Sequence, residues 1–460
     1  MIITNFPKIE NDLNDVIRSF SLKVEDITAT HQFVEDEKGL FIRVLFEDKE
    51  YVKRFLKTDY KDEIEKIRLI KRYSKILLYN ALKERFNVNH PWGSLTGIRP
   101  VKLYKQLTER EKVDAYDYFN NVYDVSKEKC DLAKQIYDVQ KPLYDNTGRG
   151  INLYIGIPFC VSRCYYCSFI SQDLRFSKPE IVDIYLDALI KDVLCAKQLL
   201  NAKNYNLRSV YIGGGTPTSL NESQLERLLS VCDFDVPEFT VEAGRPDTIT
   251  EKKLELISKV ANRISINPQT AKDQTLSKIG RNHTFKDFLD CYEMANKYDF
   301  EINCDLIAGL MDEDANDFEN SVKEIISLNP ENITLHTLSL KAGSKLKEST
   351  STNQNDNVFE MMQRGYKNLF ENGYKPYYLY RQKYMAGNLE NTGFYKKSPC
   401  IYNIDIMEEN TSIIACGANA ISKKFYNEEN RLERFAYPKD VMTYVQKIDK
   451  NLEERAKLFE

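Results

Sequence analysis

The chain reads LYIGIPFCVSRCYYCSF from Leu153 to Phe169. The stretch opens with a short apolar run of the kind that forms a buried strand. Three cysteines follow, Cys160, Cys164 and Cys167, in a C-x3-C-x2-C spacing that occurs only once in the chain. The stretch therefore predicts a strand that leads directly into a thiol-rich loop.

Further strands of the same kind follow, separated by charged segments with helical periodicity. The six candidate strands are Leu153–Ile157, Ser209–Ile212, Phe239–Glu242, Arg263–Ile266, Glu301–Ile307 and Asn332–Leu338. This alternation predicts an α/β fold with a parallel sheet, either open or curled into a barrel. In such barrels functional residues gather where the strands end. The residues found at or after these ends are the cysteines, GGGTPT, Glu242, Gln269 and Asp305.

Composition indicates an ordinary globular protein. The 460 residues include 65 Lys+Arg and 69 Asp+Glu, a net charge of −4, with 42% hydrophobic and 29% charged residues. These proportions exclude a disordered chain or a coiled coil, and 18 Gly with 14 Pro exclude a collagen-like one. No apolar stretch is long enough to span a membrane, and the start, MIITNFPKIENDL, does not have the pattern of a signal peptide. We therefore expect a cytoplasmic protein with about three domains.

The first part of the chain predicts an α+β region without an evident catalytic motif. Lys38–Val52 alternates like a strand pair, and Tyr60–Phe86 has apolar residues at helical spacing. Residues 51–100 carry 12 Lys+Arg against 5 Asp+Glu. Because acids interrupt these basic residues, they predict a solvated helix face rather than a nucleic-acid surface. A loop-bearing cap and a closing helix from Tyr437 are expected near the end of the chain.

The three clustered cysteines favour a [4Fe–4S] cluster. A cluster with a protein ligand on every iron takes four thiolates, so three leave one iron open to a small molecule. Two alternatives remain. A structural zinc site would need a fourth Cys or His, but none of the four histidines is near this loop in sequence. The cysteines could also be unrelated core thiols, as we expect for the seven scattered ones.

The cysteine loop resembles the signature of radical S-adenosylmethionine (SAM) enzymes. The sequence I-P-F-C and the segment VYIGGGTPTSL (Val210–Leu220) resemble the oxygen-independent coproporphyrinogen III oxidase (HemN-type) branch. LTGIRP, EAGRPDT, INPQT and YRQKYMAGNLEN resemble the HemZ subgroup of that branch. The resemblance implies an N-terminal α+β extension (1–148), a partial (β/α)6 radical SAM barrel (149–385) and a HemN-like C-terminal cap (386–460).

The resemblance also implies the site residues. Cys160, Cys164 and Cys167 would hold the cluster, and Tyr154 and Glu242 are the candidate catalytic residues. The residues implied to bind SAM are Tyr154, Tyr166, Gly213, Gly214, Gly215, Thr216, Glu242, Gln269, Arg281 and Asp305. Their chemistry is suitable: glycines allow close backbone approach, carboxylates suit an ammonium group or ribose hydroxyls, and a guanidinium suits a carboxylate.

The implied reaction is the oxygen-independent conversion of two propionates of coproporphyrinogen III to vinyls, giving protoporphyrinogen IX in porphyrin biosynthesis. The implied partners are a tetrapyrrole substrate and a small electron donor such as flavodoxin or ferredoxin. We expect no membrane span and no nucleic acid. Arg245, Arg381 and Lys383 are candidate partners for the substrate's carboxylates, and His336 is expected to be a hydrogen-bonded core histidine rather than a substrate or haem contact.

Three positions depart from the related families and leave the substrate open. Gly156 replaces the usual histidine before I-P-F-C, and Phe169 stands where the oxidase has a further cysteine. The haem-chaperone relatives also have Phe there, but their H-N-x-x-Y-W haem motif is not intact, because Gly387 stands at its histidine, before Asn388, and no Tyr-Trp pair follows. The alternatives are a haem-binding or haem-transfer protein on the same fold, or a radical SAM enzyme acting on another tetrapyrrole or an RNA.

Overall fold

The computed structural model describes residues 2–145, 147–169, 171–178, 180–339, 355–382, 385–427, 429 and 431–460. Lys383 lies outside these ranges. The chain forms two compact units, Met1–Gln135 with Arg381–Leu389 and Ile136–Tyr380 with Glu390–Glu460. The three-part division expected from the sequence stays a prediction. No helix within the described ranges is long and apolar enough to cross a membrane.

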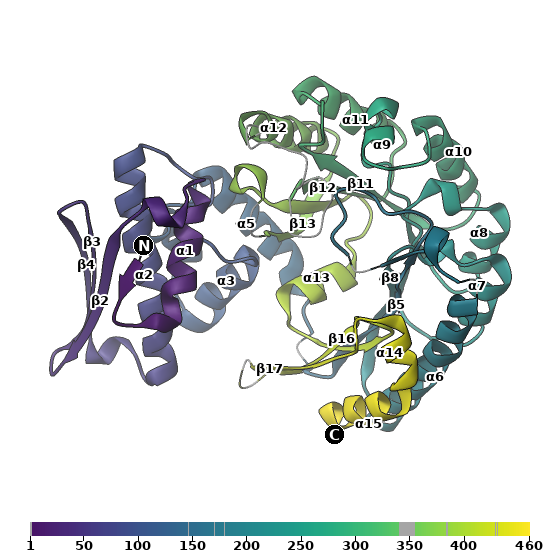
Figure 1. Ribbon diagram of the computed structural model, residues 1–460, viewed down its shortest axis with the longest axis horizontal. Helices are drawn as coiled ribbons and strands as arrows, with labels where there is room; N and C mark the ends of the chain where they lie inside the picture. Colours follow the sequence, from purple (N-terminus) through teal and green to yellow (C-terminus); the bar gives the residue numbers. More distant parts are fainter. Residues whose placement is uncertain are drawn as a thin grey trace. The chain divides into compact units, whose positions relative to one another are not determined.

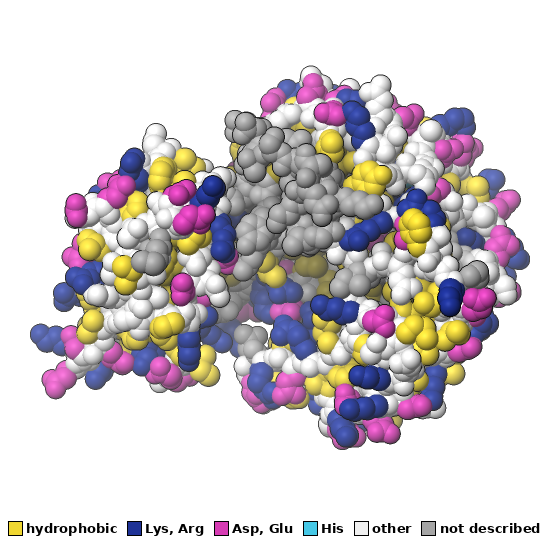
Figure 2. Space-filling model, in the orientation of Figure 1, with side chains coloured by type: hydrophobic (Ala, Val, Ile, Leu, Met, Phe, Trp, Pro, Cys, Tyr) yellow, Lys and Arg dark blue, Asp and Glu magenta, His cyan; other side chains and the backbone are white. Residues whose placement is uncertain are grey.

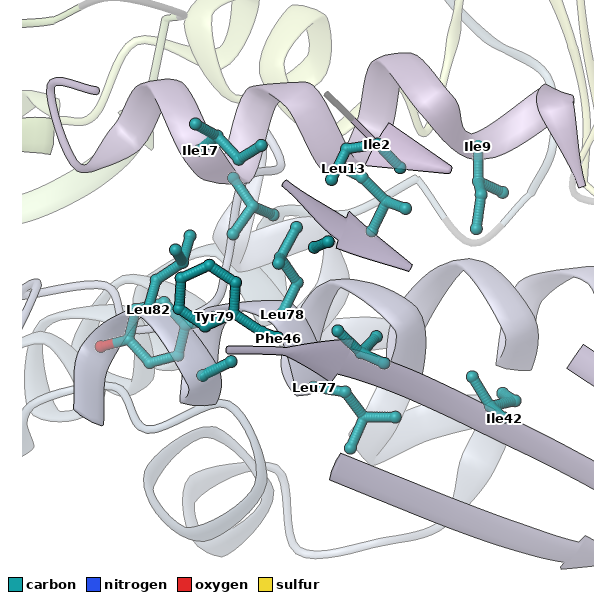
Figure 3. Packing of buried hydrophobic residues seen from close by; sticks show 14 of the residues in the cluster. Ile2, Ile9, Leu13, Ile17, Ile42, Phe46, Leu77, Leu78, Tyr79 and Leu82 are labelled. Carbon is teal, nitrogen blue, oxygen red and sulfur yellow. The ribbon is translucent and has the colours of Figure 1, made fainter. Parts of the chain in front are cut away.

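The first unit is built on a four-stranded sheet in the order β1-β2-β3-β4. Its main elements are β1 (Ile2–Thr4), α1 (Glu10–Ser19), β2 (Ala29–Asp36), β3 (Gly39–Phe46), β4 (Lys49–Leu56) and α2 (Glu63–Phe86). The predicted strand pair and long helix are confirmed by β3, β4 and α2. Figure 3 shows apolar side chains of α1, α2 and β3 meeting in one core, including Leu13, Leu78 and Ile42.

The basic excess of residues 51–100 is largely compensated by acidic side chains nearby. Lys66 lies between Glu35 and Glu63, and Arg72 pairs with Glu111. Figure 2 shows acidic and basic side chains mixed over the visible face of this unit. The shorter helices that follow are α3 (Pro100–Gln106), α4 (Ala115–Asp117) and α5 (Lys127–Gln140).

The second unit contains six parallel strands in sequence order, each followed by helical segments. The strands are β5 (Gly150–Ile157), β8 (Asn206–Gly214), β9 (Glu238–Glu242), β10 (Arg263–Ser265), β11 (Glu301–Ala308) and β12 (Asn332–Thr337). The covering helices are α6 (Glu180–Ala202), α7 (Glu222–Leu229), α8 (Glu251–Ser258), α9 (Asp273–Lys278), α10 (Phe285–Ala295) and α11 (Ala315–Ser327). Figure 1 shows these helices in an outer arc around the strands. All six strands predicted from the sequence are confirmed.

Additional strands extend this sheet at both edges. Next to β5 come β15 (Ser412–Cys416), β16 (Ile421–Tyr426) and β17 (Arg431–Ala436), and beyond β12 come β14 (Asn391–Tyr395) and β13 (Lys375–Tyr380). Within the described residues the end strands β13 and β17 do not pair with each other, so the sheet is an open, partial barrel. The remaining elements are β6 (Phe159–Cys160), β7 (Gln172–Asp173), α12 (Asn355–Glu371), α13 (Ile401–Glu408), α14 (Val441–Gln446) and α15 (Ile448–Phe459). The prediction of a single closing helix is wrong, because the helix is interrupted at Lys447, between α14 and α15.

Helix α13 packs against side chains from alternate positions of the barrel strands. The Glu238 carboxylate accepts hydrogen bonds from the backbone N–H groups of Ile401 and Tyr402, at 2.6 and 2.8 Å. The Tyr402 ring stacks on Tyr211 of β8, with 4.4 Å between ring centroids. Because residues two apart on a strand share a face, Glu242 lies on the same face of β9 as Glu238.

A buried ion pair attaches the end of the chain to the barrel. Asp192 of α6 and Arg455 of α15 are fully buried and paired. The Asp192 carboxylate also accepts hydrogen bonds from the hydroxyls of Tyr437 and Tyr444 and from the Gly417 N–H. Such a network compensates the cost of burying both charges.

Removing this guanidinium should destabilise the barrel. In Arg455→Ala the buried Asp192 carboxylate loses its counter-charge, and we expect the free energy of unfolding to fall by about 3–5 kcal/mol. Lys191→Ala is the matched control, because Lys191 pairs with Asp449 across the same two helices in an exposed position. Its effect should be about 1 kcal/mol or less. Urea denaturation followed by circular dichroism measures both, and equal effects would contradict this role of Arg455.

Candidate functional site

The cysteine loop is attached to the barrel on both sides. The backbone N–H of Thr216 donates to the Phe159 carbonyl at 2.8 Å, and the Thr216 hydroxyl donates to the Cys160 sulfur at 3.5 Å. Farther along the loop, the Tyr165 N–H donates to the Ile279 carbonyl at 2.9 Å. The loop is therefore held between the end of β8 and the end of α9.

The three thiols form a donor set that fits an iron–sulfur cluster. Cys164 is buried, and Cys160 and Cys167 are half-buried. Burial raises the pKa of the Cys167 thiol to about 11 and also raises the pKa of Cys160, so metal binding has to displace the protons. Within the described ranges, no group of three His, Cys, Asp or Glu side chains is arranged to hold a single metal ion. A four-iron cluster does not need this convergence, because each thiolate binds its own iron.

The glycine turn after β8 lies directly against the cysteine loop. A Cβ atom on Gly215 would lie 2.4 Å from the Phe159 carbonyl oxygen and 3.0 Å from the Cys160 sulfur. A Cβ on Gly213 would lie 2.7 Å from Glu242 Oε2, and Gly214 has a φ of +114°. Glycine is therefore required here for both close approach and backbone conformation.

Two carboxylates and a histidine lie on three strands of the barrel, Glu242 at the end of β9, Asp305 on β11 and His336 on β12. Burial raises the pKa of Glu242 to about 7, and the nearby Asp305 carboxylate adds to this effect. Burial alone would also raise the pKa of Asp305, but His336 and the amide of Asn303 hold it below its usual value. His336 Nε2 is 3.5 Å from Asp305 Oδ2, and Asn303 Nδ2 donates to Asp305 Oδ1 at 2.8 Å. Two adjacent carboxylates provide a favourable place for a cationic group of a ligand.

Arg281 connects the cysteine loop to the strand ends. Its Nη2 donates to the Tyr166 hydroxyl at 3.0 Å, and its Nη1 donates to the carbonyls of Gly244 and Asn267 at 2.8 and 3.0 Å. Gln269, with a φ of +69°, donates its N–H to the Asp305 carbonyl at 3.0 Å.

Several buried polar atoms near these residues have no protein partner. Within the described chain, the unpaired atoms in this region are Thr240 Oγ1, Asn267 Oδ1, Gln269 Oε1 and Arg281 Nε. Buried polar groups are normally hydrogen-bonded to protein, water or ligand. The arrangement therefore fits a ligand that has both donors and acceptors, as SAM does.

Three aromatic rings stand next to the carboxylates. Tyr154, Tyr211 and Tyr402 are stacked at interplanar angles of 19°. Burial raises the pKa of each phenol, and the negative charge of Glu242 contributes to the shift in all three. These neutral rings form an apolar wall beside an acidic region.

Most of the sequence-predicted cofactor residues lie near the carboxyl ends of the barrel strands or in the loops that follow them, Tyr154 lies within β5, and Arg281 follows helix α9. Two of the candidate cationic partners of a substrate lie within the described residues. Arg245 contacts the cysteine loop, with Nη1 3.6 Å from the Cys164 sulfur. Arg381 belongs to the first unit, where its guanidinium lies 5.6 Å from the Trp92 ring centroid.

Sequence reasoning missed Thr240, Asn267 and the part of α13 that carries Tyr402. A signal for Thr240 was present, because EFTVE alternates polar and apolar residues and so predicts that Glu238, Thr240 and Glu242 share a face. Asn267 follows a strand end and could have been noted by that rule. Nothing in the sequence around Tyr402 indicates its contact with β8.

Three comparisons with known proteins agree on the family. The model of the radical SAM superfamily matches residues 154–325. The oxygen-independent coproporphyrinogen-III oxidase-like protein HemZ of Bacillus subtilis is 35% identical over 429 residues, which cover 90% of this chain and 85% of that protein. The heme chaperone HemW of the same organism is 36% identical over 193 residues, 40% of this chain and 49% of that protein.

The structure resembles that of coproporphyrinogen III oxidase (HemN) from Escherichia coli. The TM-score is 0.53 at 20% identity, and the match covers 69% of this chain and 73% of that one. This likeness establishes the fold, an open radical SAM barrel. Radical SAM proteins use a [4Fe–4S] cluster and SAM, and the donor set and polar groups described above fit both. The chain therefore belongs to the radical SAM superfamily, in the family of oxygen-independent coproporphyrinogen III oxidase-like proteins that includes HemZ.

Proposed function

We propose that this protein converts two propionates of coproporphyrinogen III to vinyls, giving protoporphyrinogen IX in porphyrin biosynthesis. The main support is its similarity to HemZ over nearly the whole of both chains, together with a cysteine loop packed against a glycine turn and two carboxylates. When bound, the cluster and SAM supply one-electron chemistry that removes a hydrogen atom from a substrate.

In this proposal the residues of the chain bind, orient and shield the cofactors. Cys160, Cys164 and Cys167 hold the cluster. Glu242 accepts from the SAM amine, and Arg281 is oriented by Tyr166 to meet the SAM carboxylate, since a guanidinium fits a carboxylate. The other residues proposed to line the SAM site are Tyr154, Gly213, Gly214, Gly215, Thr216, Gln269 and Asp305.

The enclosure of the site supports a reaction that must exclude water. Helix α13 occupies the inner side of β8 and β9, and its Tyr402 completes the tyrosine stack with Tyr154 and Tyr211. Excluding water protects reactive intermediates from side reactions. The flat aromatic wall is also suited to the face of a pyrrole ring.

The haem-carrier alternative has less support in the structure. Gly387 occupies the position of the chaperone motif's histidine and has a φ of +63°. The neighbouring Asn388 uses its side-chain amide to donate to the Ser19 carbonyl at 2.5 Å, within the first unit. This segment has no histidine of its own and is already engaged in packing, since Asn388 Nδ2 also lies 3.5 Å from Nδ1 of His90.

A radical SAM reaction on another substrate is the second candidate, and one observation favours it. The described inner positions carry four carboxylates, those of Glu238, Glu242, Glu301 and Asp305, and the buried Arg263 is already committed to Glu301 and Asn332. A substrate with several carboxylates would find few cations there, which favours a less anionic substrate.

The first prediction from this proposal concerns iron binding. Anaerobically purified protein should contain about four irons per chain. Replacing Cys160, Cys164 or Cys167 with Ala should remove most of the iron, because the loop supplies three cluster ligands and each variant has lost one of them. Cys195→Ala, on helix α6, is the control and should keep its iron. Metal analysis that found stoichiometric zinc, or full iron in the loop variants, would contradict the assignment.

The second prediction concerns the carboxylate proposed to bind the SAM amine. Glu242→Gln should weaken SAM binding by roughly 1–3 kcal/mol, the cost of losing a charged hydrogen bond. Because the pKa of Glu242 is raised to about 7, it is protonated below that pH and ionised above it. Binding to the unaltered protein should therefore tighten as the pH rises from about 6 to about 8, and this dependence should be smaller in the variant.

Anaerobic calorimetry on cluster-loaded protein measures both effects. Glu226→Gln, an exposed acid on α7, is the control and should bind SAM like the unaltered protein. An unchanged affinity in Glu242→Gln would remove this residue from the site.

The third prediction separates the candidate functions. Loaded protein given SAM, a reductant and coproporphyrinogen III without oxygen should yield a product lighter by two CO2 and four hydrogens. The thiol of the oxidase is not available at Phe169, so turnover must proceed without it. Mass spectrometry detects the product, while 5′-deoxyadenosine formed without any change in the tetrapyrrole would favour the other substrate. Tight stoichiometric haem binding, with SAM cleavage unlinked to tetrapyrrole change, would support the carrier instead.

A further inference from the structure

Arg245 is a buried cation that points at the cysteine loop. It follows strand β9 in the EAGRPDT segment, and only 4% of its side chain is exposed. Asp247 holds two of its nitrogens, Nε at 3.0 Å and Nη2 at 2.7 Å. The remaining nitrogen, Nη1, lies 3.0 Å from the Ser162 carbonyl, 2.8 Å from the Ser162 hydroxyl and 3.6 Å from the Cys164 sulfur.

The paired contact with Asp247 fixes the direction of the third nitrogen. A guanidinium is planar, so two parallel hydrogen bonds to one carboxylate orient the whole group. Burying this cation is costly unless it is paired, and Asp247 supplies the pairing. The orientation of Nη1 toward the loop is therefore determined by the local fold, whereas an exposed arginine could adopt many directions.

We propose that Arg245 is a positioning residue that raises the reduction potential of the cluster by donating to the Cys164 sulfur and placing positive charge beside it. The inference rests on the proposed cluster site. Reduction adds an electron, so a nearby cation stabilises the reduced form more than the oxidised one. Hydrogen bonds to cluster sulfurs and local charge are the main means by which a protein sets this potential.

A second buried arginine near the loop has other partners. Arg281 donates through Nη1 and Nη2 to backbone carbonyls and to the Tyr166 hydroxyl. Arg245 contacts a sulfur of the loop directly, through Nη1. Its bonds to Ser162 also hold the loop in place, so an experiment must separate a purely structural role from an electrostatic one.

Two substitutions with opposite expected effects make this separation. Arg245→Gln removes the positive charge but keeps an amide near Asp247, and should lower the midpoint potential. Asp247→Asn leaves the guanidinium without its counter-charge, and should raise the potential. Arg227→Gln is the control, because Arg227 pairs with Asp183 and Asp187 of helix α6 and all three side chains are exposed. Its potential should equal that of the unaltered protein.

The measurement is an anaerobic redox titration of each full-length, iron-loaded protein, followed by electron paramagnetic resonance, with iron content determined for each sample. An unchanged midpoint potential in iron-loaded Arg245→Gln would overturn the proposal. A change of the midpoint potential in the same direction in both variants would also overturn it. If Arg245→Gln fails to retain iron, the Asp247→Asn variant tests the proposal: a raised midpoint potential would support it, and an unchanged or lowered one would overturn it. Absence of iron from the unaltered protein would instead overturn the proposed cluster site, and this inference with it.

Discussion

Moving a carboxylate from water into a protein interior costs roughly several kcal/mol of free energy unless a partner compensates its charge. The described inner positions of this barrel carry four such carboxylates. Glu301 is compensated by Arg263, and Glu238 by the first N–H groups of α13. Asp305 has His336 and Asn303. Glu242 is compensated in part by the Gly214 N–H and the charge of Arg281, and burial still raises its pKa to about 7. This partly compensated acid lies at the end of β9, next to the glycine turn, where a cationic ligand would complete it.

The need to compensate buried carboxylates also explains where the last part of the chain packs. The first backbone N–H groups of helix α13 satisfy Glu238, and its Tyr402 ring stacks on Tyr211. At the outer side, Arg455 from the final helix neutralises Asp192. Strand β15, from the segment expected as a cap, pairs with β5 in the same sheet.

The loop between β13 and β14 connects the two compact units covalently. Its residues, Arg381–Leu389, pack within the first unit, where Arg381 donates its N–H to the Ile98 carbonyl at 2.8 Å. Ile98 belongs to the LTGIRP motif, so two motifs far apart in the sequence meet here. Arg381, Gly387 and Asn388, which from the sequence alone suggested substrate or haem binding, therefore have a structural role in this unit.

The sequence by itself determined the six parallel strands, because apolar runs and helical periodicity are local properties. It also determined the cysteine loop and the glycine turn, whose spacing and residue types restrict the chemistry. Only the tertiary structure decided which charges meet. Arg245, a candidate partner for a substrate's carboxylates, turns to Cys164, and His336 turns to Asp305, because side-chain direction depends on strand register and on the partners that burial makes necessary. The contact of α13 with the barrel was likewise decided by packing between segments about 190 residues apart, as from Tyr211 to Tyr402, for which no local pattern exists.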